Sequence, residues 1–339
     1  IWDLTAPTSG PRLAGWLPLN AARLLRAAGA APSDAVKTVM GLGYLLGGMG
    51  IYLWLRRRWD EPAALLAAGV YLFLPYRLAV LYVAGEPGEV WALGLYPWVA
   101  WAGEAFVRRP RLGSALAALL VWTLLLASHA GLAVCAALGF GLALSIARRS
   151  PWGLALIAPA LPIAILEILA GSAGDFHSHY PYLFQLFSAS WNAAPSGPGW
   201  INEMPFQLGV APLGLAGLAL FWPPPRPSLP LGARRIEARA ILALGIGLAC
   251  VLTLSLSAPL WRLTRFDHLL AAPWQMLGFA GLGLAALAGA LVRRAPILAT
   301  RPLLAGLLAL NLVAVYAYLA PAWSDITPRL SPVYFGDRQ

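Results

Sequence analysis

The sequence predicts an all-α, polytopic integral membrane protein with about ten spanning helices. Its 339 residues are 60% hydrophobic and only 11% charged, whereas soluble domains carry about 25% charged residues. The apolar residues fall in runs close to the ~20 residues that one helical crossing needs, and arginines gather between those runs. Length alone would suggest two soluble domains, but the composition predicts a membrane protein instead.

The first 35 residues are not apolar enough to span a membrane. Between Arg12 and Ala31, Leu and Trp alternate with Asn and Arg at helical spacing. This pattern predicts an amphipathic helix that lies in the membrane interface. We expect residues 1–35 to form an outer interfacial segment, residues 36–320 the helix bundle, and residues 321–339 an outer tail.

Ten apolar ranges are candidate crossings. His129 separates two glycine- and alanine-rich halves of 113–147, which favours a tight hairpin over one long helix. The ranges are 36–55, 62–84, 89–107, 113–128, 130–147, 152–170, 206–222, 240–257, 273–292 and 302–320.

Arginine clusters occupy every second connection between these ranges, and they hold fifteen of the 24 Lys and Arg residues. Because basic residues accumulate in the cytoplasmic loops of membrane proteins, these connections are predicted to face the cytoplasm of a bacterial cell, with both ends of the chain outside. The same distribution explains the net charge of +10 without nucleic acid as a partner. The clusters are Arg56, Arg57 and Arg58; Arg108, Arg109 and Arg111; Arg148 and Arg149; Arg226, Arg234, Arg235 and Arg239; and Arg293, Arg294 and Arg301.

Two outer segments are distinctive. Residues 171–205 are rich in aromatics, Pro and Gly, and a loop of this length is expected to be packed and functional. Residues 258–272 carry a cluster of charged and ionisable side chains before Trp274. Cys135 and Cys250 lie inside apolar runs and are expected to be core residues without a disulfide.

Four stretches, in this order, resemble bacterial membrane proteins of the YfhO type, also known as the 6-pyruvoyl-tetrahydropterin-synthase-related membrane domain. They are P-Y-R-L-A-V-L-Y-V-A-G-E-P-G-E-V-W-A-L at 75–93, L-A-S-H-A-G at 126–131, S-W-N-A-A-P-S-G-P-G-W-I-N-E-M-P-F-Q-L-G at 190–209, and P-L-W-R-L-T-R-F-D-H-L-L-A-A-P-W-Q at 259–275. The family is similar to the C-type (GT-C) glycosyltransferases, which take a sugar from a polyprenyl-phosphate carrier at the outer membrane face.

This resemblance implies a catalytic Asp in the first outer loop, just after the first span. We expect that residue upstream of Ile1, because Asp3 corresponds to the later part of the loop. The resemblance also implies an acidic motif at the turn 85–89, where Glu86 and Glu89 would hold a divalent metal or the carrier phosphate. Oxygen ligands suit Mg²⁺ or Mn²⁺. The alternative is two interfacial carboxylates, with Glu89 at the start of the next helix.

Arg77 lies inside an apolar run, where an unpaired charge costs at least ~2.5–3.5 kcal/mol. It is expected either to meet the carrier phosphate or to form an ion pair inside the bundle. We expect Arg77, both glutamates and the segment 262–268 to face one outer cavity. The remaining candidates for binding carrier, sugar or acceptor, each with a purely structural alternative, are His129, Glu203, Gln207, Arg262, Arg265 and His268.

The leading hypothesis is a GT-C-like glycosyltransferase that uses a polyprenyl-phosphate sugar carrier. The alternative is a non-catalytic subunit of a larger membrane complex that retains the transferase scaffold. A zinc site at His177 and His179, near Asp175, is a weaker hypothesis because no third ligand is identifiable. The sequence contains no nucleotide-binding motif and no motif for c-type haem attachment. Glu104 and Glu167, near the ends of spans, are interpreted as interfacial or paired.

Overall fold

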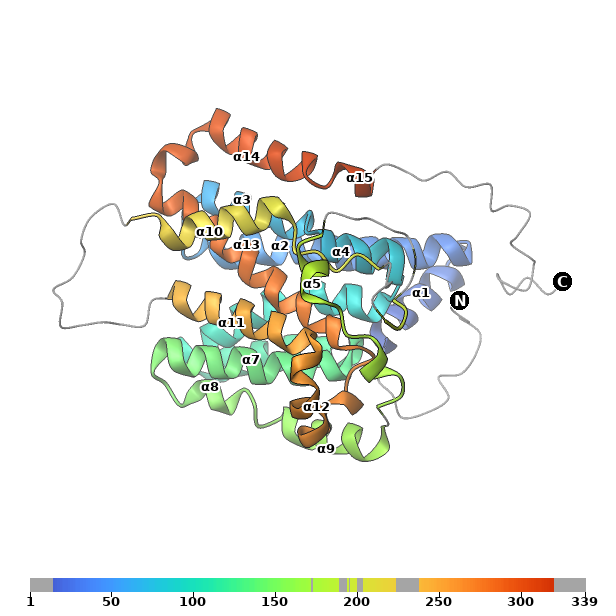
Figure 1. Ribbon diagram of the computed structural model, residues 1–339. Helices are drawn as coiled ribbons and strands as arrows, with labels where there is room; N and C mark the ends of the chain where they lie inside the picture. The colour runs from blue at the N-terminus through green and yellow to red at the C-terminus, as the bar shows by residue number, and fades with distance from the viewer. Residues whose placement is uncertain are drawn as a thin grey trace, which may run out of the picture.

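The computed structural model is a bundle of helices (Figure 1). It describes residues 15–171, 173–188, 194, 196–199, 204–223 and 238–319. Every regular element within these ranges is a helix, so the predicted all-α class is confirmed.

The helices follow one another with short connections. The first group comprises α1 (Trp16–Ala27), α2 (Pro32–Arg56), α3 (Glu61–Leu72), α4 (Pro75–Ala79), η1 (Val80–Ala84), α5 (Pro87–Arg108), α6 (Leu112–Ser128), α7 (Ala130–Arg148), α8 (Trp152–Ala155) and α9 (Ala160–Ala170). The second group comprises η2 (Phe176–Ser178), η3 (Leu183–Leu186), α10 (Val210–Phe221), α11 (Ala238–Thr253), η4 (Ser255–Ser257), α12 (Ala258–Thr264), η5 (Phe266–His268), η6 (Pro273–Met276), α13 (Leu277–Arg294), η7 (Pro296–Ala299), α14 (Arg301–Val313) and α15 (Tyr316–Leu319).

The amphipathic helix expected near the N-terminus is α1. Trp16 and Leu24 are exposed, whereas Ala22 is buried against Ala35 and Val39 of α2. One face of α1 therefore packs on the bundle and leaves apolar side chains on the other. Its position in a membrane interface stays a prediction.

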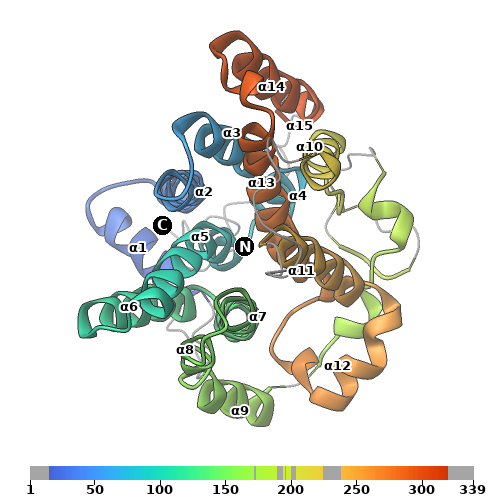
Figure 2. The same ribbon diagram turned by 90° about the vertical axis from the view of Figure 1, so that its left-hand side faces the viewer.

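The helix α13 forms the centre of the bundle and contacts α3, α10 and α11 (Figure 2). Its Gly- and Ala-rich sequence allows neighbouring backbones to come close. A Cβ at Gly289 would lie 2.7 Å from the carbonyl oxygen of Ala63. The pair α2 and α5 is tighter still, since a Cβ at Gly94 would clash with the carbonyl oxygen of Gly43. Small residues thus fix the closest helix crossings.

Within the part of the chain that the structure describes, three helical segments are long and apolar enough to cross a membrane, namely α2, α7 and the continuous segment Pro273–Arg294. The number rises to five if each of two bent helix pairs counts as one crossing. Each of the ten predicted ranges contains helix, but α6, α9, α10 and α14 are shorter apolar helices of 10–17 residues. The figure of about ten spans therefore stays a prediction.

One of the two bends has a clear sequence cause. Between α3 and α4 the chain turns by 43° just before Pro75, and proline cannot donate the backbone hydrogen bond that would continue the preceding helix. Between α11 and the η4–α12 segment the chain turns by 85° at Leu254. The second bend sends α12 nearly at right angles to α11.

Arginine-rich connections meet at one end of the bundle around Glu104 of α5. The Glu104 carboxylate, only 5% exposed, forms ion pairs with Arg58, Arg108 and Arg148, the second at 2.7 Å, and accepts a hydrogen bond from Trp54 Nε1 at 3.1 Å. Three connections that the sequence places on one side are thus joined by one buried acid. Glu104 was expected to be interfacial or paired, and the structure shows it paired.

Replacement of Glu104 by Gln should destabilise the protein. It leaves three neighbouring arginines without their shared counter-charge, and loss of one partner of a buried ion pair costs about 3–5 kcal/mol, less where the cations are partly exposed as here. The thermal unfolding midpoint in detergent should fall clearly. Glu61→Gln is the matched control, because the Arg56–Glu61 pair is exposed and such pairs contribute roughly 0–1 kcal/mol. Equal midpoints for the two variants would contradict this account.

Candidate functional site

A buried polar network lies at the end of α5 opposite to Glu104. Glu89, in the first turn of α5, is 1% exposed. One of its carboxylate oxygens accepts a hydrogen bond from the Tyr76 hydroxyl, and the other accepts one from Gln275 Nε2 at 3.1 Å. The network therefore joins α4, α5 and η6, which are far apart in the sequence.

Gln275 extends the network to the hairpin between α6 and α7. Its Nε2 lies 3.2 Å from His129 Nε2, while its Oε1 accepts hydrogen bonds from the backbone of Ala271 at 3.0 Å and Ala272 at 3.4 Å. His129 Nδ1 accepts from the backbone N–H of Leu132 at 3.3 Å and so caps α7. The tight hairpin expected at this histidine is present.

A cavity of about 320 Å³ lies next to this network. Its ionisable lining residues come from three segments of the chain: His129 from the first, Glu167 and Asp175 from the second, and His268 from the third. His268 is held in place, since its Nδ1 lies 3.2 Å from the carbonyl oxygen of Ile168 and 3.1 Å from that of Gly171. The helix α7 starts at this cavity and ends at Arg148, beside Glu104. Its 19 residues correspond to ~28 Å of rise, so the cavity and the arginine cluster lie at opposite ends.

Arg77 has a different environment from the one predicted. It is 2% exposed, and its terminal nitrogens donate to the carbonyl oxygens of Tyr44 at 2.9 Å and Tyr71 at 3.2 Å. The guanidinium also lies over both tyrosine rings, 4.7 Å and 4.2 Å from their centroids. Arg77 therefore faces α2 and α3, whereas its neighbour Tyr76 faces Glu89.

The structure consequently gathers only part of the predicted site. Glu89 and His129 belong to one network, and His129 and His268 line one cavity. Glu86 is exposed at the start of α5, and Arg77 lies elsewhere. Arg262 and Arg265 are exposed on and just after α12, and Gln207 is buried where the chain enters the bundle before α10. Glu203 lies outside the described residues.

The described residues do not fit the divalent metal expected at Glu86 and Glu89. Both Glu89 oxygens accept hydrogen bonds from neutral donors. Among the described parts of the chain, no group of three or more His, Cys, Asp or Glu side chains could hold a metal ion. The same finding gives no support to the zinc hypothesis for His177 and His179.

Sequence reasoning missed the neutral members of the network, Tyr76 and Gln275. Both lie in stretches that carry the family resemblance, but neither has a charge to single it out. The signal that could have pointed to them was Glu89, because a buried carboxylate needs hydrogen-bond donors close by.

Long apolar helices and a buried polar network define this chain as a helical membrane protein. A family model described as the 6-pyruvoyl-tetrahydropterin synthase related domain, a membrane protein, matches residues 17–205. The chain therefore belongs to this family, as its resemblance to the YfhO type predicted. No curated protein and no solved structure matches the chain.

Replacement of Tyr76 by Phe tests the buried network. It removes a hydrogen-bond donor from the Glu89 carboxylate, and an unsatisfied buried polar group costs about 1–3 kcal/mol, more when it is charged. The unfolding midpoint in detergent should fall. Tyr82→Phe is the matched control, because Tyr82 on the neighbouring η1 turn is 63% exposed. If Tyr76→Phe had the same unfolding midpoint as this control, the hydrogen bond from Tyr76 would not contribute to stability.

Proposed function

We propose that the protein is a membrane-embedded transferase that takes a sugar from a polyprenyl-phosphate carrier at the outer face of a bacterial cytoplasmic membrane. The small cavity lined by His129, Glu167, Asp175 and His268 is the observation that carries the proposal. Ionisable side chains from distant segments meet there, at the end of the bundle opposite to the arginine cluster. Perturbed or convergent ionisable groups in a cavity are the usual mark of a functional site.

The proposed orientation follows from the two ends of the bundle. Arg58, Arg108 and Arg148 meet at Glu104, and an arginine-rich end belongs in the cytoplasm. The ten apolar ranges then cross the membrane in alternation, with the bent and short helices completing crossings that single helices do not. The cavity opens on the outer side in this arrangement.

The segment around α12 offers features that suit a lipid phosphate. Arg262 and Arg265 are exposed, and arginine binds phosphate through paired hydrogen bonds. Leu256 and Leu263 are 78% and 84% exposed, next to the 85° bend. If α11 crosses the membrane, α12 lies along its surface, with leucines for the prenyl chain and arginines for the phosphate.

The chemistry requires charge stabilisation at the leaving phosphate, because interactions stronger in the transition state than in the ground state raise the rate. In this proposal the two arginines provide that stabilisation. The carboxylates of Glu167 and Asp175 accept hydrogen bonds from sugar hydroxyls in the cavity.

A second candidate function is a non-catalytic subunit of a larger membrane complex. The observation that favours it is that Glu89 and Arg77 make hydrogen bonds to neutral groups inside the bundle. Such contacts serve stability as well as catalysis. Fold membership does not decide between these functions.

Cysteine labelling tests the orientation. In a protein with Cys135 and Cys250 replaced by Ala, a cysteine at Arg57 should resist a membrane-impermeant maleimide applied to intact spheroplasts. A cysteine at Ser178, which is exposed beside the outer cavities, should react. Ready labelling at position 57 would reverse the orientation and place the cavity in the cytoplasm.

Sugar transfer tests the activity. The full-length protein in proteoliposomes should transfer radiolabelled sugar from a polyprenyl-phosphate carrier, and Asp175→Asn should slow transfer by roughly 10- to 100-fold, the value of a hydrogen bond to a charged group. Asp60→Asn, an exposed acid at the arginine end, is the matched control. Equal rates for the two variants would remove Asp175 from the site. Absence of transfer with every carrier-linked sugar tried would favour the non-catalytic subunit.

A further inference from the structure

A chain of three polar side chains connects η5 to the segment after α9. His177 Nε2 lies 2.7 Å from Asp267 Oδ2, and His177 Nδ1 lies 3.1 Å from the Tyr180 hydroxyl. Asp267 is 4% exposed. Its other oxygen has no hydrogen-bond partner among the described residues, and His268 Nε2 lies 3.9 Å from it. Asp267 and His177 are 90 residues apart, so folding alone creates this arrangement.

The direction of the protons follows from the chemistry of the three groups. A carboxylate oxygen only accepts, so His177 Nε2 carries a proton toward Asp267. In the neutral imidazole Nδ1 is then the acceptor, and the Tyr180 hydroxyl donates to it. Burial raises the pKa of the Tyr180 hydroxyl to about 12, which keeps its proton in place at neutral pH. A hydroxyl oxygen can accept a hydrogen bond while its own proton is donated.

Aromatic packing fixes the position of these three hydrogen-bonded side chains. Phe176 is fully buried, and its ring centroid lies 5.1 Å from that of Trp261 of α12. Trp261 is held in turn, since its Nε1 donates to Ser257 Oγ at 2.9 Å and to the carbonyl oxygen of Leu252 at 3.0 Å. The His177 and Tyr180 side chains therefore have a rigid support, as a binding site needs.

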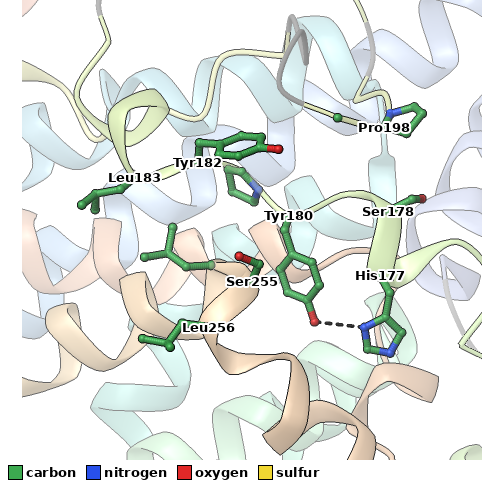
Figure 3. A pocket seen from close by; sticks show the side chains of 11 residues that line it. His177, Ser178, Tyr180, Tyr182, Leu183, Pro198, Ser255 and Leu256 are labelled. Atoms are coloured by element: carbon green, nitrogen blue, oxygen red, sulfur yellow. Dashed lines mark hydrogen bonds between the residues drawn. The ribbon is translucent and has the colours of Figure 1, made fainter.

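A cavity of about 540 Å³ lies beside His177 and Tyr180, separate from the cavity that His268 lines. Figure 3 shows the Tyr180 hydroxyl turned toward His177, with Tyr182, Ser255 and Leu256 around the same space. Pro198 and Gly199 also line it, and their segment is tied down by a contact of 2.9 Å between Ser196 Oγ and His179 Nδ1. The volume is within the ~300–1,000 Å³ typical of small-molecule sites.

We infer that this cavity binds a neutral polyhydroxylated ligand, a carbohydrate, one hydroxyl of which donates to the Tyr180 oxygen. Two observations favour this class. The described lining combines tyrosine and proline faces with serine hydroxyls, which suits the alternating apolar and hydroxyl surfaces of a sugar ring. It includes His177 but no Lys, Arg, Asp or Glu. Arg262 and Asp267 lie near enough to Tyr180 to act on it electrostatically, but neither lines the cavity, so a phosphorylated or cationic ligand would find no charged partner in the lining.

The assignment of this ligand as the sugar acceptor rests on the proposed function. In that reaction the acceptor hydroxyl gives its proton to the Tyr180 oxygen while Tyr180 passes its own proton to His177 Nδ1, and Asp267 stabilises the imidazolium. The acceptor oxygen forms a bond to the anomeric carbon of the carrier-linked sugar. The bond from that carbon to the phosphate oxygen breaks, and its electron pair leaves with the phosphate.

Saturation-transfer NMR on the full-length protein in detergent tests the binding site. The probes are glucose, galactose, N-acetylglucosamine and myo-inositol, with glucose 6-phosphate as the charged counterpart. At least one neutral probe should bind saturably and more tightly than glucose 6-phosphate. Tyr180→Phe and His177→Gln should each weaken its binding by about 3- to 10-fold, the value of one hydrogen bond. Tyr316→Phe is the control, because Tyr316 is exposed on α15.

Each outcome decides the inference. Failure of all neutral probes to bind, tighter binding of glucose 6-phosphate, or wild-type binding by Tyr180→Phe would overturn it. Sugar binding without transfer by the wild-type protein would reject the proposed function and leave the binding site in place. If transfer occurs, His177→Ala should lose it and regain part of it with added imidazole. Unchanged transfer by that variant would reject the proton relay alone.

Discussion

The structure depends on satisfying buried ionisable groups inside an apolar bundle. A charge removed from water is costly unless it is paired or hydrogen-bonded, and three such groups find partners in three ways, although Arg77 Nε has no hydrogen-bond partner among the described residues. Glu104 has three arginines, Arg77 has carbonyl oxygens and two tyrosine rings, and Glu89 has a tyrosine and a glutamine. Each solution requires residues from helices that are distant in the sequence.

These interactions divide the bundle into two chemically different ends. The Glu104 end contains full charges of both signs and gathers the arginine-rich connections. The Glu89 end contains a buried acid with neutral partners, and beside it lie two cavities lined by histidines. The helices α5 and α7 run between the ends and hold them apart. The sequence shows the difference between the two ends only as an alternation of arginine-rich and other connections. In the fold, three of the arginine-rich connections meet at the Glu104 end.

Hydropathy was enough to predict where most helices lie, because helix position depends on local composition. The tight hairpin at His129 and the pairing of Glu104 were also predictable from local patterns. The shared cavity for Arg77 and Glu86 was not, because the bend before Pro75 and the packing of α2 and α3 decide where Arg77 points. Tyr76 and Gln275 carry no charge, and His177 meets Asp267 only through tertiary structure. Contacts between residues so far apart in the sequence leave no periodic pattern from which they could be predicted.

The central position of α13 also affects how the protein is made. Its partner α3 is synthesised about 200 residues earlier, which is roughly 10–40 s at ~5–20 residues per second. During that interval α3 has no α13 to cover its small-residue face. Until α13 is made, the residues of α3 that pack closely against Gly289, such as Ala63 and Ala67, are without their final neighbour.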